Sequence, residues 1–306
     1  MRFSDLAAWW RLRRLVHEPW GAAMQRRNPA PGLREIRLLD GGSVFFRGGT
    51  PDAHCFHHIF GCDEYGLDAF PPGTLGTVVD VGAHIGLFTV RAARLAHRVI
   101  AIEPVGENFQ LLERNVASAR VQNVHCRRLC LSDADGTAEI IISGRNDAHS
   151  IYGSKAGAAE SESVPAMTLE SIFRTEGIDR CDFLKLDCEG AECAALINAP
   201  REIMDRIERI AMEYHPVPNP EHTGPALAGH LRSVGFRVTI RPSKRKPEQG
   251  EMFCQREEVR SQQSGAGSPQ RGAHQPSSSR LLTSVFYLCS ESVTGATFNE
   301  GRNWVI

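Results

Sequence analysis

A short stretch near residue 80 constrains the fold of this chain more than any other part of its sequence. Val78 to Gly86 reads VVDVGAHIG, with β-branched residues, an aspartate and two glycines. Gly82 and Gly86 allow a tight turn because they carry no Cβ, and the apolar residues that follow recur at helical spacing. The next apolar run, Val99 to Ile102, predicts a second strand that ends at Glu103. The sequence therefore predicts a strand, a glycine turn, a helix and a parallel strand in succession.

The glycine turn and Glu103 together predict a site for a nucleoside-containing cofactor. A carboxylate at that strand end can accept hydrogen bonds from a ribose diol. A dinucleotide fingerprint requires G-x-G-x-x-G, and the segment from Gly82 to Leu87 holds only two of those three glycines. Asp80, just before the turn, instead suits the ammonium and sulfonium charges of S-adenosylmethionine. The pattern therefore favours S-adenosylmethionine and argues against an NAD-dependent oxidoreductase.

Predicted strands and helices alternate between about residues 75 and 240, as a doubly wound sheet requires. Besides the first two strands, we expect strands at residues 124–131, 183–186, 207–213, 236–240 and 282–288, and helices at 108–119 and 225–234. The last two strands would pair antiparallel. We expect an α/β fold with a doubly wound, mostly parallel, seven-stranded sheet of Rossmann-like type.

Residues 1–70 form an N-terminal α/β extension that we expect to act as a lid, with a strand at Val44 to Arg47 and a helix at Ala53 to Phe60. Residues 71–290 form the main domain, and 291–306 a tail. Within the main domain, Ala138 to Ser143 predicts an inserted hairpin arm. Residues 241–280 have too few apolar side chains to offset chain entropy, so we expect a disordered insertion there.

Overall composition is consistent with one large soluble domain. The chain has 306 residues, is 42% hydrophobic and has a formal net charge of −1. This balance gives no electrostatic footprint for nucleic acid, and no apolar run reaches the length of a membrane-spanning helix. The nine cysteines lack paired C-x-x-C spacing, which suggests thiols in a reducing cytoplasm.

Three tryptophans near the N-terminus have two interpretations. Trp9, Trp10 and Trp20 lie among several arginines. Such a segment packs most often on the body of its own protein, which is the interpretation that we favour. The alternative is an amphipathic helix that contacts a membrane surface.

Acidic side chains and one histidine follow the ends of several predicted strands. Ligands of open α/β sheets bind outside the carboxyl ends of the strands, so these residues predict a single site. The cofactor half comprises Asp80, Gly82, His84, Gly86, Glu103, Ser132 and Asp133, with the last two near the adenine amino group. The acceptor half comprises Asp187, Glu189, Glu213 and His215.

Methyl transfer needs little from the protein beyond positioning the acceptor and removing its proton. Asp187 is the first candidate for this base, and His215 is the second because imidazole titrates near neutrality. Glu189 is the third catalytic candidate. Asp187 and Glu189 could instead cap the helix after Gly190, and His215 could simply hydrogen-bond in its loop. Three acids of this half could offer oxygen ligands, but they are not grouped in sequence and we expect no metal.

Six segments resemble the FkbM-type S-adenosylmethionine-dependent methyltransferases. They are VVDVGAHIG, AIEP (Ala101 to Pro104), LSDADGTAEI (Leu131 to Ile140), MTLESI (Met167 to Ile172), FLKLDCEGAE (Phe183 to Glu192) and IAMEYHP (Ile210 to Pro216). The FLKLDCEGAE run is the most specific of them. A seventh segment, Asp52 to Tyr65, resembles the entry segment of that family. The resemblance covers residues from about 45 to 240, and His84 stands where the family often has Asn.

This resemblance implies a class I methyltransferase that uses S-adenosylmethionine. The implied reaction is O-methylation of a hydroxyl on a sugar, polyketide or other small-molecule or glycan acceptor. It also implies that Asp80, Gly82 and Glu103 hold the cofactor and that Asp187 and Glu189 face the acceptor. N-methylation and a non-catalytic, cofactor-binding scaffold are the alternatives. A nucleic-acid methyltransferase would carry Asn/Asp-Pro-Pro-aromatic after the fourth strand, where this chain has Asp-Cys-Glu-Gly.

Overall fold

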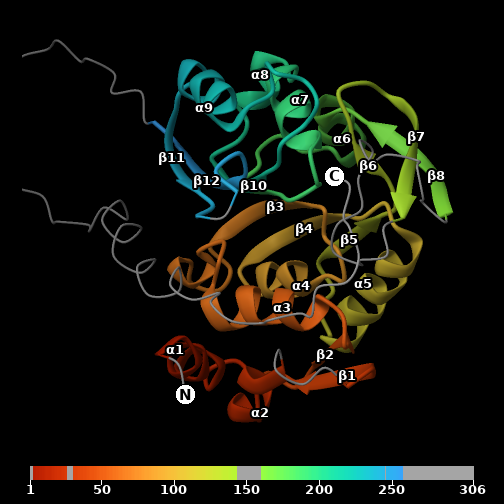
Figure 1. Cartoon of the computed structure of the whole chain (residues 1–306), viewed down its shortest axis with the longest axis vertical. Helices are drawn as coiled ribbons and strands as arrows, with labels where there is room; N and C mark the ends of the chain where they lie inside the picture. The colour runs from red at the N-terminus through yellow and green to blue at the C-terminus, as the bar shows by residue number, and fades with distance from the viewer. Residues whose placement is uncertain (1–2, 26–29, 143–159, 245, 258–306) are drawn as a thin grey trace, which may run out of the picture.

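A seven-stranded sheet forms the centre of the computed structural model, which describes residues 3–25, 30–142, 160–244 and 246–257 (Figure 1). In spatial order its strands are β11 (Phe236–Pro242), β12 (Gly250–Arg256), β10 (Arg209–Tyr214), β9 (Phe183–Leu186), β3 (Leu75–Val81), β4 (Ala96–Ile102) and β5 (Val124–Arg127). The pairs from β10 to β5 are parallel, and β12 runs antiparallel to both of its neighbours. The predicted mostly parallel, seven-stranded, Rossmann-like sheet is confirmed.

Helices cover both faces of this sheet, as its apolar strands require. On one face lie α4 (Leu87–Ala93) and α5 (Gly106–Ser118), and on the other α6 (Leu169–Glu176), α7 (Ala191–Ile197), α8 (Arg201–Met204) and α9 (Gly224–Ser233) (Figure 1). Alternate residues of β3 serve the two layers: Val78 packs with Phe88 of α4, whereas Val79 packs in the same cluster as Leu196 of α7. This alternation explains why the short strand is apolar on both sides.

The N-terminal extension packs beside α4 and α5. It consists of α1 (Phe3–Leu12), α2 (Pro19–Met24), β1 (Gly32–Arg37), β2 (Ser43–Gly48), α3 (Asp52–Phe56) and a π-helical turn at His57–Cys62. Its aromatic residues Phe46, Phe56 and Phe60 join a buried cluster with Ile85 and Leu111. The predicted strand corresponds to β2, whereas the predicted helix at 53–60 is divided between α3 and the π-helical turn.

The tryptophans of this extension are placed differently from one another. Trp9 packs against the buried cluster of the extension, whereas Trp10 and Trp20 remain about half exposed, at 50% and 47%. The guanidinium of Arg13 stacks over the Trp10 ring at 4.5 Å. Packing on the body of the protein is therefore seen for Trp9. Among the described residues, none of the helices has the length and apolar character that a membrane crossing requires.

A second sheet of three strands stands beside the carboxyl edge of the central one. It contains β6 (Cys130–Leu131), β8 (Glu160–Met167) and β7 (Gly136–Ile142), in that order. The predicted single strand at 124–131 is therefore wrong, because β5 belongs to the central sheet and β6 pairs with β8. The predicted arm at 138–143 lies almost wholly within β7, which pairs antiparallel with β8.

The last hairpin of the central sheet corrects a prediction. Gly250–Arg256 lies within the stretch 241–280 that was expected to be disordered, yet it forms β12 between β10 and β11. Met252 and Cys254 supply the buried face of β12, so a few apolar residues at alternate positions are enough for a strand paired on both sides. The predicted partner strand at 282–288 lies outside the described residues.

Candidate active site

The glycine turn after β3 touches the loop after β9. Gly82 has φ of 70°, and a Cβ at this position would overlap the carbonyl oxygen of Asp187. Gly86 has φ of 82°, and its Cβ would press against Leu112 of α5. The two glycines are therefore required by backbone conformation and by close packing, as the sequence indicated. The turn brings the cofactor half and the acceptor half of the site into direct contact.

Asp80 lies beneath this turn and is fully buried. Its carboxylate accepts a hydrogen bond from Thr89 Oγ1 at 2.5 Å, and Lys185 Nζ lies 3.3 Å from Oδ1. The same ammonium donates to the carbonyl oxygen of Gly82 at 2.6 Å. The charge of Asp80 is therefore balanced inside the protein. This placement disfavours the expected direct contact between Asp80 and a cofactor cation, and it gives the carboxylate the role of supporting the turn.

Glu103 follows β4 and is 4% exposed. Its Oε2 accepts the backbone N–H of His84 at 2.8 Å, and its Oε1 accepts that of Val105 at 3.0 Å. Burial raises the pKa of this carboxyl. The Asn108 side chain also bonds to this carboxylate. A carboxylate has about four lone-pair sites, so Glu103 is fixed in place and retains the capacity to accept a hydrogen bond from a ribose hydroxyl.

Ser132 and Asp133 follow β6, so they extend from the small sheet and not from the central one. The backbone N–H of Ser132 donates to the carbonyl oxygen of Met167 at 3.0 Å, which ties this segment to β8. Asp133 is exposed and accepts from Ser132 Oγ at 3.3 Å. Their predicted place near the adenine amino group stays a prediction.

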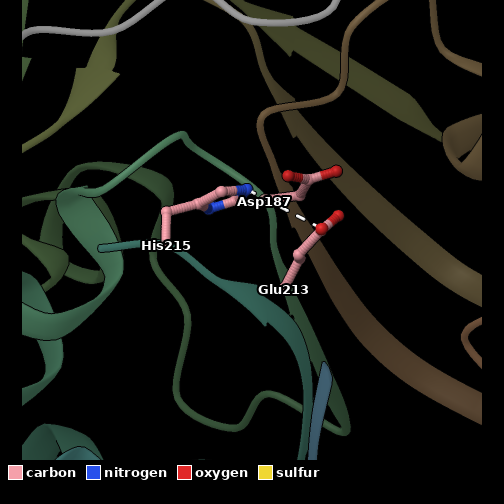
Figure 2. A group of neighbouring side chains, drawn as sticks. All are labelled: Asp187, Glu213 and His215. Atoms are coloured by element: carbon pink, nitrogen blue, oxygen red, sulfur yellow. Dashed lines mark ion pairs between the residues drawn. The ribbon is translucent and has the colours of Figure 1, made fainter. Parts of the chain in front are cut away.

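The acceptor half brings three side chains together at the ends of β9 and β10 (Figure 2). Asp187 and Glu213 each offer a carboxylate oxygen and His215 offers a ring nitrogen, and these three atoms lie within 4.8 Å of one another. His215 Nε2 is 3.9 Å from a Glu213 oxygen and 3.6 Å from an oxygen of Glu189. Tyr65 of the extension donates its hydroxyl to Asp187 Oδ2 at 3.2 Å. The structure therefore unites the three predicted catalytic residues and adds Glu213 and Tyr65.

Glu192 of α7 orients the imidazole of His215. This fully buried carboxylate accepts the backbone N–H groups of Cys188 and Gly190, and its Oε1 lies 3.2 Å from His215 Nδ1. Burial opposes the charge on His215, but the bond to Glu192 together with the negative charges of Glu192, Asp187 and Glu189 outweighs it and raises the pKa of His215 to about 10. His215 is therefore an imidazolium near neutral pH, which disfavours its expected role as a base and suits a hydrogen-bond donor.

Glu213 is favoured in its neutral form, whereas His215 is favoured in its charged form, although the pKa of each group is raised. Burial and the nearby Asp187 carboxylate raise the pKa of Glu213 to about 8. The donor set of Asp187, Glu213 and His215 could surround a divalent cation, although the imidazole would first have to lose the proton that its carboxylate neighbours stabilise. In the described structure the imidazolium of His215 forms ion pairs with Glu189 and Glu192.

The raised pKa values of Glu213 and His215 predict that the free energy of unfolding falls as the pH rises from about 5 to about 10. A carboxyl whose pKa is raised from 4.5 to about 8 gives full stabilisation below 4.5 and loses it as the pH rises through 8. His215, raised from 6.5 to about 10, acts in the same direction at higher pH. We expect the melting temperature of Glu213→Gln to change less with pH than that of the parent between about pH 5 and 8. The exposed Glu221→Gln is the control, and identical slopes for all three proteins would contradict the assignment.

Four of these residues were missed or left unassigned by sequence reasoning. The role of Lys185 in a buried ion pair could have been predicted, because a lysine within the apolar strand sequence FLKL must either reach solvent or pair with a buried anion. Glu213 was assigned to the acceptor half as a strand-ending acid and a possible oxygen ligand, without a catalytic role. Glu192 and Tyr65 gave no local signal, because their roles depend on contacts with His215 and Asp187 from distant segments.

S-adenosylmethionine fits the cofactor half as it stands. The turn presents backbone without side chains at its two glycines. Glu103 is held with spare acceptor capacity beside that turn. No phosphate-binding third glycine is present, and the cofactor has no phosphate to bind. The site thus matches a nucleoside ligand that carries a diol and lacks a pyrophosphate.

Comparison with known proteins places this site in a family. The chain is 29% identical over 249 residues to the AMB antimetabolite synthetase AmbE of Pseudomonas aeruginosa, covering 68% of this chain but only 12% of AmbE. It is 24% identical to the methyltransferase sdnD of Sordaria araneosa, covering 58% of this chain and 80% of that protein. The structure of methyltransferase FkbM from Methylobacillus flagellatus matches with a TM-score of 0.41 and 16% identity, over 67% of this chain and 53% of that one. The model of the methyltransferase FkbM domain matches residues 80–238, more than half of the sequence. The chain therefore belongs to the FkbM methyltransferase family.

Proposed function

We propose that this protein transfers a methyl group from S-adenosylmethionine to an oxygen atom of a small molecule, with a hydroxyl of a sugar or polyketide as the expected acceptor. The observation that carries the proposal is the meeting of the two half-sites at Gly82. The glycine turn, whose His84 N–H donates to Glu103, packs directly on the backbone of Asp187. A cofactor on one side and an acceptor on the other would therefore be neighbours.

The chain itself contributes positioning and proton handling. When bound, the cofactor supplies a methyl carbon activated by its sulfonium. Glu103 would hold the ribose, and Lys185 supports the turn through its hydrogen bond to the carbonyl oxygen of Gly82. On the acceptor side, His215 is held as a donor that can orient an acceptor oxygen. Asp187, whose backbone packs on the turn, carries a carboxylate that can take the proton of the hydroxyl.

Replacement of Glu103 tests the cofactor half. We expect Glu103→Gln to weaken S-adenosylmethionine binding by about 1.5–3 kcal/mol, the value of a hydrogen bond to a charged group. Isothermal titration calorimetry with S-adenosylhomocysteine measures this change without turnover. Glu113→Gln, an exposed position on the neighbouring α5, is the matched control. Unchanged affinity in Glu103→Gln would remove the ribose assignment.

The acceptor is found by its product. Cell extract is incubated with the protein and isotopically labelled S-adenosylmethionine, and new labelled metabolites are identified by mass spectrometry. A methyl ether or ester supports O-methylation, whereas a labelled N-methyl product supports the N-methyltransferase alternative. Tight cofactor binding with no labelled product from a broad acceptor panel would instead favour a non-catalytic, cofactor-binding scaffold.

A further inference from the structure

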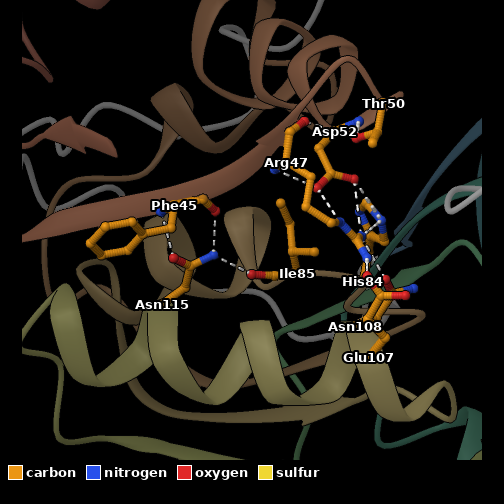
Figure 3. Close-up of polar contacts among 9 residues, drawn as sticks. All are labelled: Phe45, Arg47, Thr50, Asp52, His84, Ile85, Glu107, Asn108 and Asn115. Carbon is orange, nitrogen blue, oxygen red and sulfur yellow. Dashed lines mark hydrogen bonds and ion pairs between the residues drawn. The ribbon is translucent and has the colours of Figure 1, made fainter. Parts of the chain in front are cut away.

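The glycine turn is contacted by a segment that lies outside the matched family domain. The family match begins at residue 80, whereas β2 and the start of α3 precede it. Asn115 of α5 links the two: its Nδ2 donates to the carbonyl oxygens of Phe45 and Ile85 at 2.8 and 2.7 Å. The backbone N–H of Phe45 returns a bond to Asn115 Oδ1 at 2.6 Å. Figure 3 shows how this clamp fixes the hairpin against the turn.

Arg47 and Asp52 form the centre of this contact (Figure 3). Arg47 donates its backbone N–H and Nε to Asp52 Oδ2 at 2.9 and 2.8 Å. The guanidinium also donates to Glu107 and Asn108 of α5 at 2.9 and 2.7 Å. The Asp52 side chain is completely buried. Arg47 therefore fixes the position of Asp52. Its guanidinium is itself held by hydrogen bonds to Asp52, Glu107 and Asn108.

The Oδ1 atom of Asp52, which accepts a hydrogen bond from Arg47 Nη2 at 3.1 Å, also faces His84 on the glycine turn. Arg47 Nη2 itself lies 3.4 Å from His84 Nε2. Asp52 Oδ1 lies 3.4 Å from His84 Nε2, and the backbone of His84 has a left-handed φ of 52°. Its backbone N–H is the donor to Glu103 already described. Burial opposes a charge on the imidazole, but the bonds to Asp52 and Cys55 outweigh it and raise the pKa of His84 to about 10. The imidazole remains 20% exposed, so this positive charge can act on a ligand beside the turn.

We infer that Asp52, braced by Arg47, is a positioning residue that holds His84 as an imidazolium beside the cofactor, where its charge attracts the cofactor's carboxylate group. The inference rests on the proposed function. The titratable and charged groups that face His84 are Asp52 and Cys55 of α3, Arg47 of β2 and Glu103 after β4. Asp52 supplies a fully buried negative charge 3.4 Å from the ring nitrogen, and the buried Glu103 carboxyl also acts on the ring, whereas the Arg47 guanidinium opposes a second positive charge there. Asp52, which precedes the matched residues 80–238, would thus help to complete the cofactor site.

The test compares two ligands in three proteins by calorimetry. S-adenosylhomocysteine carries the carboxylate, and 5′-methylthioadenosine lacks it. For Asp52→Asn at about pH 8, where an imidazole of ordinary pKa is neutral, we expect S-adenosylhomocysteine to bind about tenfold more weakly or worse. Binding of 5′-methylthioadenosine should change less than about twofold. At about pH 6 a larger fraction of the imidazole in Asp52→Asn is protonated than at pH 8, so the difference in S-adenosylhomocysteine affinity between Asp52→Asn and the parent should narrow.

His84→Asn is the second variant, and it tests the inference even if Asp52→Asn fails to fold. We expect His84→Asn to fold because asparagine tolerates the left-handed conformation of this position. It should show the same selective loss for S-adenosylhomocysteine, but at both pH values. Equal losses for the two ligands, or affinities within about twofold of the parent, would overturn the inference. Failure of the parent protein to bind S-adenosylhomocysteine would refute the proposed function instead, so the two failures are distinguishable.

Discussion

Replacing Lys185 with methionine is expected to lower the free energy of unfolding by about 3–5 kcal/mol, the cost of leaving a buried charge without its partner. Lys185 is 3% exposed, and its ammonium lies 3.3 Å from the fully buried Asp80. Methionine has a similar length and would fill the space, so the loss reports the missing charge and not a cavity. Urea unfolding measures the change. Lys244→Met, at an exposed position, is the control and should leave stability nearly unaltered.

A double-mutant cycle separates the ion pair from other effects of the substitution. Asp80→Asn removes the orphaned charge and keeps the shape of the side chain. We expect Lys185→Met with Asp80→Asn to be more stable than Lys185→Met alone, with a coupling of about 1–3 kcal/mol. If the double variant is no more stable than the single one, Lys185 acts through its bond to the carbonyl oxygen of Gly82 and not through Asp80.

The central βαβ unit and the acids at strand ends could be predicted from the sequence because their signals are local. The strand, the two glycines and the helix that follows occupy adjacent residues, and each glycine meets a conformational need at its own position. Asp187 and His215 could be assigned to one site without knowledge of their contacts, because parallel strands that end at the same edge bring their C-terminal residues together.

Other parts of the site could not be predicted because they depend on pairings between distant segments. Nothing near His215 indicates that Glu192 determines its protonation, and nothing near Asp52 indicates that it faces His84. The strand β12 was missed for a related reason. Its few apolar residues lie in a largely polar stretch of the chain, and they form a strand with β10 and β11 as partners on each side. Sequence patterning detects an apolar face more easily than it detects such a two-sided partner.

Replacing Asp187 with asparagine is expected to reduce kcat by about 10²–10⁴-fold, the usual contribution of a positioned acid or base. The affinity for S-adenosylhomocysteine should change little, because only the backbone of Asp187 contacts the glycine turn. Asparagine keeps the size of the side chain and removes its charge. The measurement is steady-state turnover of the acceptor identified by isotopic labelling, combined with calorimetry of cofactor binding. A loss shared equally by turnover and cofactor affinity would move Asp187 into the cofactor half.

The pH dependence of the same variant distinguishes Asp187 from Glu213 as the base. The Asp187 carboxylate helps to raise the pKa of Glu213 to about 8, so its removal should shift the titration of Glu213 to lower pH. If Asp187 is the base, Asp187→Asn remains slow at every pH. If Glu213 is the base, activity persists and its rise moves to lower pH. Tyr65→Phe is the control, since it deletes the hydrogen bond to Asp187 Oδ2 but leaves both carboxylates in place. It should therefore retain most of the turnover that Asp187→Asn loses.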